Sequence, residues 1–245
     1  MSRDVASSRA TTEVVLEGAA KNALGTPMMR SLLDRLERAA GAPVLLTGAG
    51  DAFSAGLDLK EVASLDEARA EPFLRLLERC MAALYLYPGP TAAAVNGHAI
   101  AGGCVLAQCC DIRVATRAAQ TKIGLNEVPL GLRFPPRVLA IVRARVPRRH
   151  RERVLLGGAL FDPVEAREAG LLDELDDDTV AVARERLAAL GRSPAAAYAQ
   201  TKRDLRGATD ADLASDATLD QWIRESLPMW TSGDLKAKIA AVLRR

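Results

Sequence analysis

The chain has 245 residues, of which 49% are hydrophobic and 26% are charged, and its formal net charge is +2. This length fits one large domain or two small ones, and the small net charge without a dominant basic block gives no electrostatic support to nucleic-acid binding. Four cysteines and two histidines show neither a disulfide framework nor metal-ligand spacing, so we expect free buried thiols and no metal site.

The two ends of the sequence carry no recognisable targeting signal. The opening MSRDVASSRATTE has no apolar core, no apolar run reaches transmembrane length, and the terminal AAVLRR matches no retention signal. We therefore expect a soluble cytoplasmic protein that does not contact a membrane.

The N-terminal half alternates strand and helix patterns. Strands are predicted over 12–18, 42–50, 91–99 and 111–116, and helices over 26–41, about 65–86 and 101–110. In the first helix we expect Thr26 as the N-cap, Pro27 at the first helical position and Gly41 as the stop. The helix over 101–110 is apolar on every side, which places it at the centre of the fold.

From about Val138 onward the pattern is almost wholly helical. The acidic run over 173–178 is predicted to be an exposed turn before a helix over 180–190. Strands that alternate with helices indicate an α/β fold with parallel pairing. We therefore predict an α/β core over residues 1–190 and a helical C-terminal region over 191–245.

Two segments combine a strand, a turn of small residues and the start of a helix. The turn is SAG (54–56) in AFSAGLDLKE and AGG (101–103) in VNGHAIAGGCVL. Helix N-termini present free N–H groups, so two such turns facing each other would supply two donors to one oxygen, as an oxyanion hole does. Tight turns without a function are the alternative, and neither phosphate-loop nor dinucleotide spacing is present.

A single acid, Glu127, lies in the mostly apolar run TKIGLNEVPLG (121–131). If this carboxyl is buried without a partner, its pKa rises, and such a group is a good general base. A solvated loop glutamate is the alternative. A nucleophilic Ser54 or Thr121 acting with His98 is a weaker possibility, because no serine lies in a G-x-S-x-G elbow.

Three ordered segments, AFSAGLDLKEV, AAVNGHAIAGGCVLAQCCDIRVAT and IGLNEVPLGL, resemble the crotonase (enoyl-CoA hydratase/isomerase) superfamily. Residues 148–175 resemble the helical segment that follows in that family, and the resemblance covers about 12–245. It implies a spiral of ββα units whose helical C-terminal region supports a homotrimer or hexamer. It also implies an acyl-CoA substrate, with no cofactor beyond the coenzyme A that the substrate carries.

The resemblance also implies site residues. Glu127 matches the catalytic acid, and the backbone N–H groups of Leu57 and Gly102 match the oxyanion-hole donors. The implied substrate-binding residues are Ala55, Gly56, Leu57, Asp58, Leu59, Gly102, Val105 and Leu125.

Two departures from the family pattern favour one reaction. Val105 stands where hydratases carry their first glutamate, and Pro135 stands where dienoyl-CoA isomerases carry an aspartate. The chain most resembles Δ3,Δ2-enoyl-CoA isomerases, which use a single glutamate to shift a 3-enoyl double bond to position 2. The alternatives are a hydratase with a relocated acid, another crotonase-like acyl-CoA enzyme such as a decarboxylase, and a non-catalytic member that binds CoA or a protein.

Several other residues have a structural and a functional interpretation. We expect Asp111 to anchor the chain after the central helix, Lys60 to be solvated, and Asn126 to form a turn, with orientation of Glu127 as its alternative. Trp222 and Trp230 are expected in the core or in trimer packing, with a place in the acyl pocket as the alternative.

Overall fold

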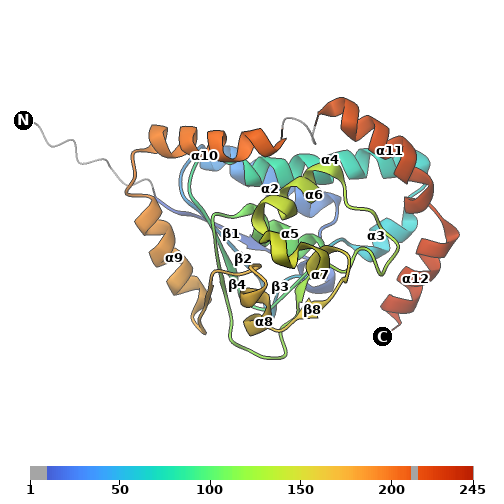
Figure 1. Ribbon diagram of the computed structural model, residues 1–245, viewed down its shortest axis with the longest axis horizontal. Helices are drawn as coiled ribbons and strands as arrows, with labels where there is room; N and C mark the ends of the chain where they lie inside the picture. The colour runs from blue at the N-terminus through green and yellow to red at the C-terminus, as the bar shows by residue number, and fades with distance from the viewer. Residues whose placement is uncertain (1–9, 211–214, 245) are drawn as a thin grey trace, which may run out of the picture.

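The structure is a computed structural model that describes residues 10–210 and 215–244, without the side chains of 208–210 (Figure 1). Two sheets form its centre. The five-stranded sheet has the order β1 (Thr12–Leu16), β2 (Val44–Gly48), β4 (Thr91–Val95), β6 (Ile112–Ala115), β9 (Glu174–Leu175), and all its pairs are parallel. The four-stranded sheet has the order β3 (Ala52–Ser54), β5 (His98–Ile100), β7 (Ile123–Gly124), β8 (Leu160–Phe161), and only its β7–β8 pair is antiparallel.

The chain repeats one unit of two strands and a helical segment. The pairs β2–β3, β4–β5 and β6–β7 each place their first strand in the larger sheet and their second in the smaller one, and a helix follows each pair. This repetition confirms the predicted spiral of ββα units. The helices of this part are α1 (Ala19–Asn22), α2 (Thr26–Ala39), α3 (Leu59–Ser64), α4 (Glu67–Tyr85), α5 (Gly102–Cys109) and α6 (Pro136–Arg145).

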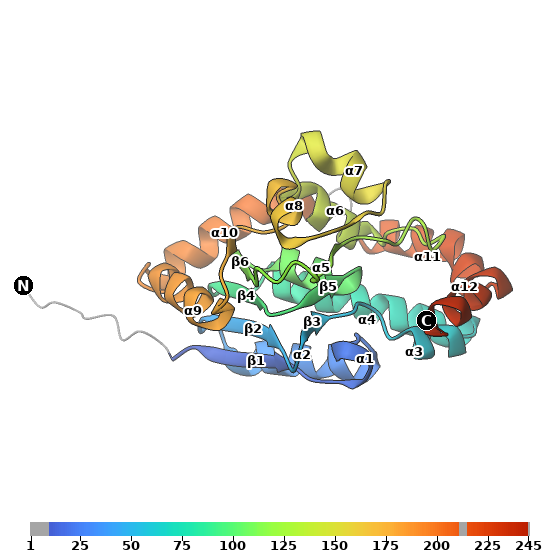
Figure 2. The ribbon, with the colours of Figure 1, turned by 90° about the horizontal axis from the view of Figure 1, so that it is seen from below.

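The rest of the chain is mainly helical and surrounds this centre. Its helices are η1 (Arg148–His150), α7 (Arg151–Leu155), α8 (Pro163–Glu168), α9 (Thr179–Leu190), α10 (Ala195–Asp210), α11 (Asp216–Trp230) and α12 (Gly233–Leu243). Figure 2 shows α6, α7 and α8 at the top of the view, and α2 at the bottom beside β1, the edge strand of the larger sheet. Helix α9 packs on strands of the larger sheet, while α11 packs on α4 and α12 packs on α3.

Helix α5 lies at the centre, as its apolar sequence predicts. All eight of its residues are buried, and it contacts α4, α6 and β5. The four cysteines are free and buried. Burial raises the pKa of Cys80, Cys104 and Cys110 to about 12, so these thiols pack as small apolar groups.

Two predicted helix ends are wrong. Gly25, not Thr26, is the N-cap of α2, because the Glu61 carboxylate accepts the Thr26 N–H at 2.8 Å and the Thr26 hydroxyl at 2.5 Å. The helix predicted from residue 65 begins instead at Glu67, where the Asp66 side chain accepts the Arg69 N–H and caps a new helix after α3.

The predicted exposed turn over 173–178 is also wrong in part. It contains β9, which pairs with β6, and Asp173 forms an ion pair with the buried Arg113 at 2.6 Å. An arginine buried on β6 needs a carboxylate, and this pairing draws the acidic run onto the sheet. Only the end of the run has the predicted role, since Asp178 caps α9.

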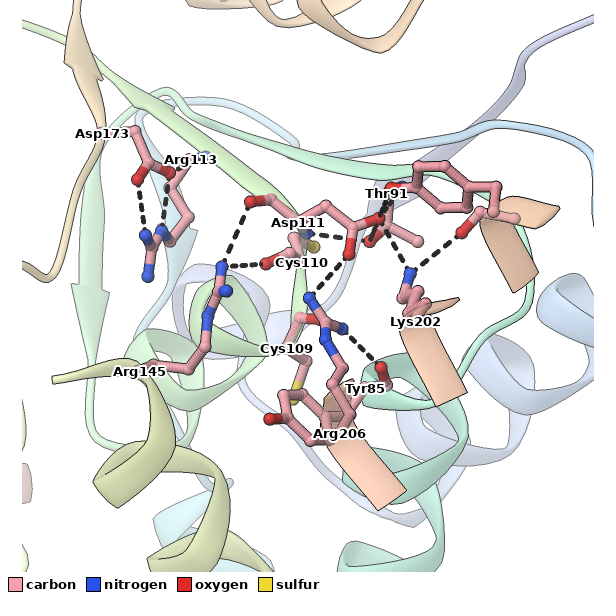
Figure 3. Close-up of polar contacts among 12 residues, drawn as sticks. Tyr85, Thr91, Cys109, Cys110, Asp111, Arg113, Arg145, Asp173, Lys202 and Arg206 are labelled. Atoms are coloured by element: carbon pink, nitrogen blue, oxygen red, sulfur yellow. Dashed lines mark hydrogen bonds and ion pairs between the residues drawn. The ribbon is translucent and has the colours of Figure 1, made fainter. Parts of the chain in front are cut away.

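Helix α10 is attached to the core through one buried carboxylate, Asp111, which follows α5 (Figure 3). Its Oδ2 accepts hydrogen bonds from Lys202 Nζ and Tyr198 Oη, each at 2.8 Å, and its Oδ1 accepts one from Arg206 Nη2 at 2.6 Å. The Thr91 N–H also donates to Oδ2, at 2.7 Å. Burial alone would raise the pKa of Asp111, but the charges of Lys202 and Arg206 hold it below its usual value. The anchoring role predicted for Asp111 is confirmed.

The cations around Asp111 also bind main-chain carbonyls at the ends of two helices. Arg206 Nη1 donates to the carbonyls of Tyr85 and Cys109, the last residues of α4 and α5. Arg145 Nη2 donates to Cys110 O at 2.6 Å (Figure 3). Positive charge at a helix C-terminus is stabilising, so this cluster (Asp111, Arg145, Lys202 and Arg206) fixes the C-terminal end of α5.

Candidate functional site

A cavity of about 370 Å³ lies between the N-terminal end of α5, the segment 126–135 and the last two helices. Its lining is mainly apolar, and its only charged or amide side chains among the described residues are those of Asn126, Glu127 and Arg133. Enclosed apolar cavities with few polar groups are typical ligand sites. A larger open groove of about 1170 Å³ runs along α2, α3 and α4, but it contains none of the site residues predicted from the sequence.

The two small-residue turns, which would form an oxyanion hole if they faced each other, are in contact beside this cavity. A Cβ placed on Gly56 would lie 2.7 Å from Ile100 O and 3.3 Å from Gly102 N, so no larger residue fits. Gly56 also has a φ of +90°, a conformation that favours glycine. The approach of the two turns therefore depends on the absence of a side chain at this position.

The N–H groups of Leu57 and Gly102 are available to a ligand. Leu57 forms a parallel bridge with Leu24, in which Leu24 N donates to Gly56 O at 2.7 Å and Asp58 N donates to Leu24 O at 3.2 Å. The Leu57 N–H therefore points away from Leu24. Gly102 is the first residue of α5, where an N–H has no acceptor within its helix. Both residues line the cavity, and neither N–H makes a hydrogen bond within the described part of the chain.

The residue before Gly102 has a strained backbone. Ala101 is the N-cap of α5 and adopts φ 49° and ψ −122°, a region that alanine rarely occupies. Such a conformation costs about 1–3 kcal/mol and persists only where the surroundings impose it. Here the Ala101 N–H donates to Gly124 O at 2.8 Å and Val105 N donates to Ala101 O at 3.0 Å. These two bonds hold the turn that presents the Gly102 N–H.

Glu127 supplies the cavity with its carboxyl group. It follows β7 in a turn that the hydrogen bond from Leu132 N to Glu127 O closes at 2.9 Å. Its Oε2 is buried and has no hydrogen-bond partner among the described residues. Burial raises the pKa of Glu127 from its usual 4.5 to about 7, which its own backbone N–H opposes only in part. The other charged residue of the lining, Arg133, forms an ion pair with Glu225 at 3.2 Å.

The structure brings together most of the predicted site residues. The cavity is lined by Ala55, Leu57, Leu59, Gly102, Val105 and Glu127. Three others lie outside the lining. Gly56 is buried behind the turn, Asp58 caps α3 through the N–H groups of Lys60 and Glu61 at 2.9 and 3.2 Å, and Leu125 is fully buried in the core.

The two positions at which the family resemblance would place a second acid are apolar here, and both line the cavity. Val105 and Pro135 both belong to the lining, and Glu127 is its only carboxyl among the described residues. Leu130 also lines the cavity, whereas Val128 is 40% exposed and contributes nothing to it. The site therefore offers one acid–base group in apolar surroundings.

Sequence reasoning missed the wall that the C-terminal helices contribute. It consists of Trp230 from the end of α11 and of Leu235, Ile239 and Val242 from α12. Trp230 was assigned to the cavity only as an alternative, while Trp222 packs in the core as expected. The spacing of the three α12 residues marks one helix face and could have indicated this role.

The residues of the weaker serine hypothesis lie outside the cavity. The fully buried Ser54 donates its hydroxyl to Asn22 O at 2.8 Å and accepts the Gly56 N–H at 3.3 Å. His98 Nδ1 accepts the Lys122 N–H at 3.0 Å. Ser54 thus stabilises the first glycine turn instead of facing a substrate. In residues 10–210 and 215–244 no cluster of histidine, cysteine or acidic residues could hold a metal ion, and no helix there could span a bilayer.

Comparison with known proteins identifies the class of this site. Residues 8–232 match the sequence model of the family described as "Enoyl-CoA hydratase/isomerase". A putative enoyl-CoA hydratase from Thermus thermophilus is 33% identical over 239 residues, which cover 92% of this chain and 90% of the relative. The chain therefore belongs to the enoyl-CoA hydratase/isomerase family, the crotonase superfamily that its sequence resembles.

Relatives that are named isomerases are similar as well. The mitochondrial enoyl-CoA delta isomerase 1 of Mus musculus is 34% identical over 170 residues, 69% of this chain and 59% of that protein. The crystal structure of human mitochondrial delta3-delta2-enoyl-CoA isomerase superposes with a TM-score of 0.89 at 26% identity, over 96% of this chain and 93% of that one. Because the relatives include both hydratases and isomerases, the family alone does not decide the reaction.

Proposed function

We propose that this protein is a Δ3,Δ2-enoyl-CoA isomerase, which converts a 3-enoyl-CoA into the 2-enoyl-CoA. One observation carries the proposal. Among the described residues, the cavity holds a single carboxyl, that of Glu127, whose pKa is raised to about 7, beside two backbone N–H groups without a partner in the described chain and apolar residues at both second-acid positions. Acyl-CoA is the substrate in this proposal, and the reaction needs no cofactor beyond the coenzyme A that the substrate carries.

The reaction needs one group that takes a proton and then returns it. Ionised Glu127 removes a proton from C2, and the electron pair moves into a dienolate whose charge lies on the thioester oxygen. The N–H groups of Leu57 and Gly102 would stabilise that oxygen, and each such donor is typically worth about 10²–10³ in rate. Protonated Glu127 then delivers the same proton to C4, so no water is consumed. A pKa near 7 makes both protonation states of Glu127 accessible.

Hydration is the second candidate, and the lining argues against it. Adding water to a 2-enoyl-CoA requires the site to orient a water molecule and to transfer a proton. Val105 and Pro135 can do neither, so a hydratase mechanism would have Glu127 alone for both tasks.

Product identification tests the assignment. The purified protein is incubated with trans-3-hexenoyl-CoA in deuterated water, and the products are separated by chromatography and analysed by mass spectrometry. We expect 2-hexenoyl-CoA as the main product, and hydration of added 2-hexenoyl-CoA at a far lower rate. Comparable rates on the two substrates would contradict the isomerase assignment.

The oxyanion-hole donors need a test by added bulk, because a backbone N–H cannot be deleted by truncating a side chain. A Cβ on Gly102 would lie 3.1 Å from Leu24 Cδ1 and would intrude where the thioester must approach. We expect Gly102→Val to lower kcat/KM by at least about 10². Leu57→Ala, which keeps its backbone N–H, should stay within about tenfold of wild type. Full activity of Gly102→Val would exclude this donor.

The homotrimer or hexamer expected from the family resemblance remains a prediction. Multi-angle light scattering of the purified protein measures the assembly mass directly. A monomer would contradict it.

A further inference from the structure

The cavity has two walls that come from different parts of the chain. The wall that carries the proposed chemistry contains Leu57, Gly102 and Glu127. The other wall consists of Trp230, the last residue of α11, and of side chains from α12. Since α11 packs on α4 and α12 packs on α3, the second wall is fixed relative to the first without sharing its residues. Changes in the second wall can therefore alter the shape of the cavity while the acid and the N–H groups stay in place.

Burial separates the mouth of the cavity from its closed end. Val242 on α12 is 42% exposed, and Arg133 is exposed as well, so these residues mark the mouth. Met81, Val105 and Trp230 are among the lining residues that are almost completely buried, as the residues of a closed end must be. A chain that enters past Val242 and reaches the buried part of the lining can therefore contact the indole of Trp230.

The indole is held in place by the corner between α11 and α12. Thr231 Oγ1 donates to Leu227 O at 3.0 Å, and Leu235 N donates to Ser232 Oγ at 3.1 Å, so the residues on both sides of the corner are hydrogen-bonded. Trp230 Nε1 is buried and has no hydrogen-bond partner among the described residues. The indole is a large apolar group, so its truncation would change the volume of the cavity.

We propose that Trp230 forms the end wall of the acyl pocket and restricts the substrates to short and medium acyl chains. The volume of about 370 Å³ supports this, because it lies near the lower end of the roughly 300–1,000 Å³ usual for ligand cavities. The inference rests on the proposed function for the identity of the substrate as a 3-enoyl-CoA. Because the inference concerns the shape of the acyl pocket, measurements of acyl-CoA binding can test it without any measurement of catalysis.

The test compares two tryptophans of the same helix. Trp230→Ala and Trp230→Phe are measured beside Trp222→Ala. Trp222 is also buried with an unpartnered Nε1, but it does not line the cavity. For each protein, kcat/KM is determined with six-, ten- and sixteen-carbon trans-3-enoyl-CoAs, and dissociation constants are determined with the saturated acyl-CoAs of the same lengths.

We expect Trp230→Ala to raise the preference for sixteen over six carbons at least about tenfold, since each newly buried methylene adds about fourfold in affinity. Trp230→Phe should shift this chain-length preference in the same direction by a smaller factor. If Trp230→Ala does not fold, the Trp230→Phe variant decides the test. Trp222→Ala should lower the melting temperature and leave the preference unchanged.

An unchanged preference in both Trp230 variants, or an equal shift in Trp222→Ala, would overturn the inference. If the wild type binds acyl-CoAs but isomerises none of them, the proposed function fails. A shift in the dissociation constants of the Trp230 variants would still support the end wall in that case.

Discussion

Two buried carboxyl groups lie near opposite ends of α5. They differ in their hydrogen-bond partners and in the direction of their pKa shifts. Asp111 follows the C-terminal end of the helix and accepts hydrogen bonds from Lys202, Arg206 and Tyr198, which accompany a lowered pKa. Glu127 shares the cavity at the N-terminal end with Gly102, has an unpartnered buried oxygen, and has a pKa of about 7. Both carboxyl groups are therefore buried, and the number of hydrogen-bond donors and cations around each one distinguishes them.

This difference separates an acid that holds the fold together from one that can exchange a proton. An acid with several donors is ionised at every physiological pH and is costly to remove. An acid with too few donors is held partly protonated by its burial, and the fold loses stability when that acid ionises. The two variants that exchange each acid for its neutral amide should therefore behave in opposite ways.

The largest effect is expected for Glu127→Gln. The amide cannot take a proton from C2, so turnover of 3-enoyl-CoA should fall by about 10²–10⁴. At a pH near 8 the same change should raise the free energy of unfolding by about 1–3 kcal/mol, because no charge is buried any longer. Both quantities are measured on one preparation, with the exposed Glu168→Gln as the control that changes neither. A variant with more than about a tenth of wild-type turnover would exclude Glu127 as the base.

Asp111→Asn should give the opposite result. It leaves Lys202 and Arg206 buried without their shared carboxylate, which typically costs about 3–5 kcal/mol in unfolding free energy. Activity per folded molecule should remain within about tenfold, because the cavity does not include Asp111. Urea unfolding measures the first quantity and low-temperature assays measure the second.

Should Asp111→Asn not fold, Tyr198→Phe offers a milder version of the same test. It removes a single hydrogen bond to Asp111 and should cost about 1 kcal/mol. Unchanged stability in both variants would show that Asp111 is not an anchor.

The pH dependence should also differ between the two acids. Glu127 must be ionised to act as the base, so kcat/KM should rise with pH to a plateau, with a midpoint near 7. Because its neutral form is favoured in the fold, Glu127 lowers stability progressively as pH rises from 4.5 to about 7. The stability gained in Glu127→Gln should therefore grow over this range and vanish below it.

The contribution of Asp111 to the free energy of unfolding should change with pH in the opposite direction. Its pKa is lowered in the fold, so its contribution is complete above the usual 3.8 and is lost as pH falls below that value. The stability difference between wild type and Asp111→Asn should shrink on acidification. A difference that is constant over the acid range would contradict the ion pairing.

The smallest effect is expected at Ala101, which sets the N-terminal end of α5. Ala101→Gly relieves the strain of a positive φ but adds flexibility to the unfolded chain, so stability should rise by only about 1 kcal/mol. The control is Ala107→Gly within α5, which should lower stability by at least about 0.5–1 kcal/mol. If both glycines destabilise equally, the backbone at Ala101 is not strained.

The sequence predicted the parts of the molecule that depend on local pattern. The central helix followed from the continuous apolar run 101–110, and Glu127 stood out because its neighbours carry no charge. The two small-residue turns were recognised as possible donors to one oxygen because each follows a strand and opens a helix, and the structure places Gly56 and Gly102 in contact.

Features that depend on distant partners could not be read from the sequence. Glu61 takes over the capping expected of Thr26, and Arg113 draws Asp173 onto the sheet from 60 residues away. Strand β8 has only two residues, too few to give a periodic pattern. The cavity wall at Trp230 depends on how α11 and α12 return to the core, which no local pattern specifies.

The attachment of α10 has a consequence for the order in which the chain can fold. Arg206, which donates a hydrogen bond to Asp111 Oδ1, is 95 residues away from Asp111 in the sequence. At about 5–20 residues per second, a ribosome needs roughly 5–20 s to synthesise that interval. During this time Asp111 can be buried only without its cations, so burial at the C-terminal end of α5 is disfavoured until α10 has been made. Burial of Asp111 thus depends on the synthesis of α10, and nascent chains that end before residue 206 should leave the C-terminal end of α5 exposed.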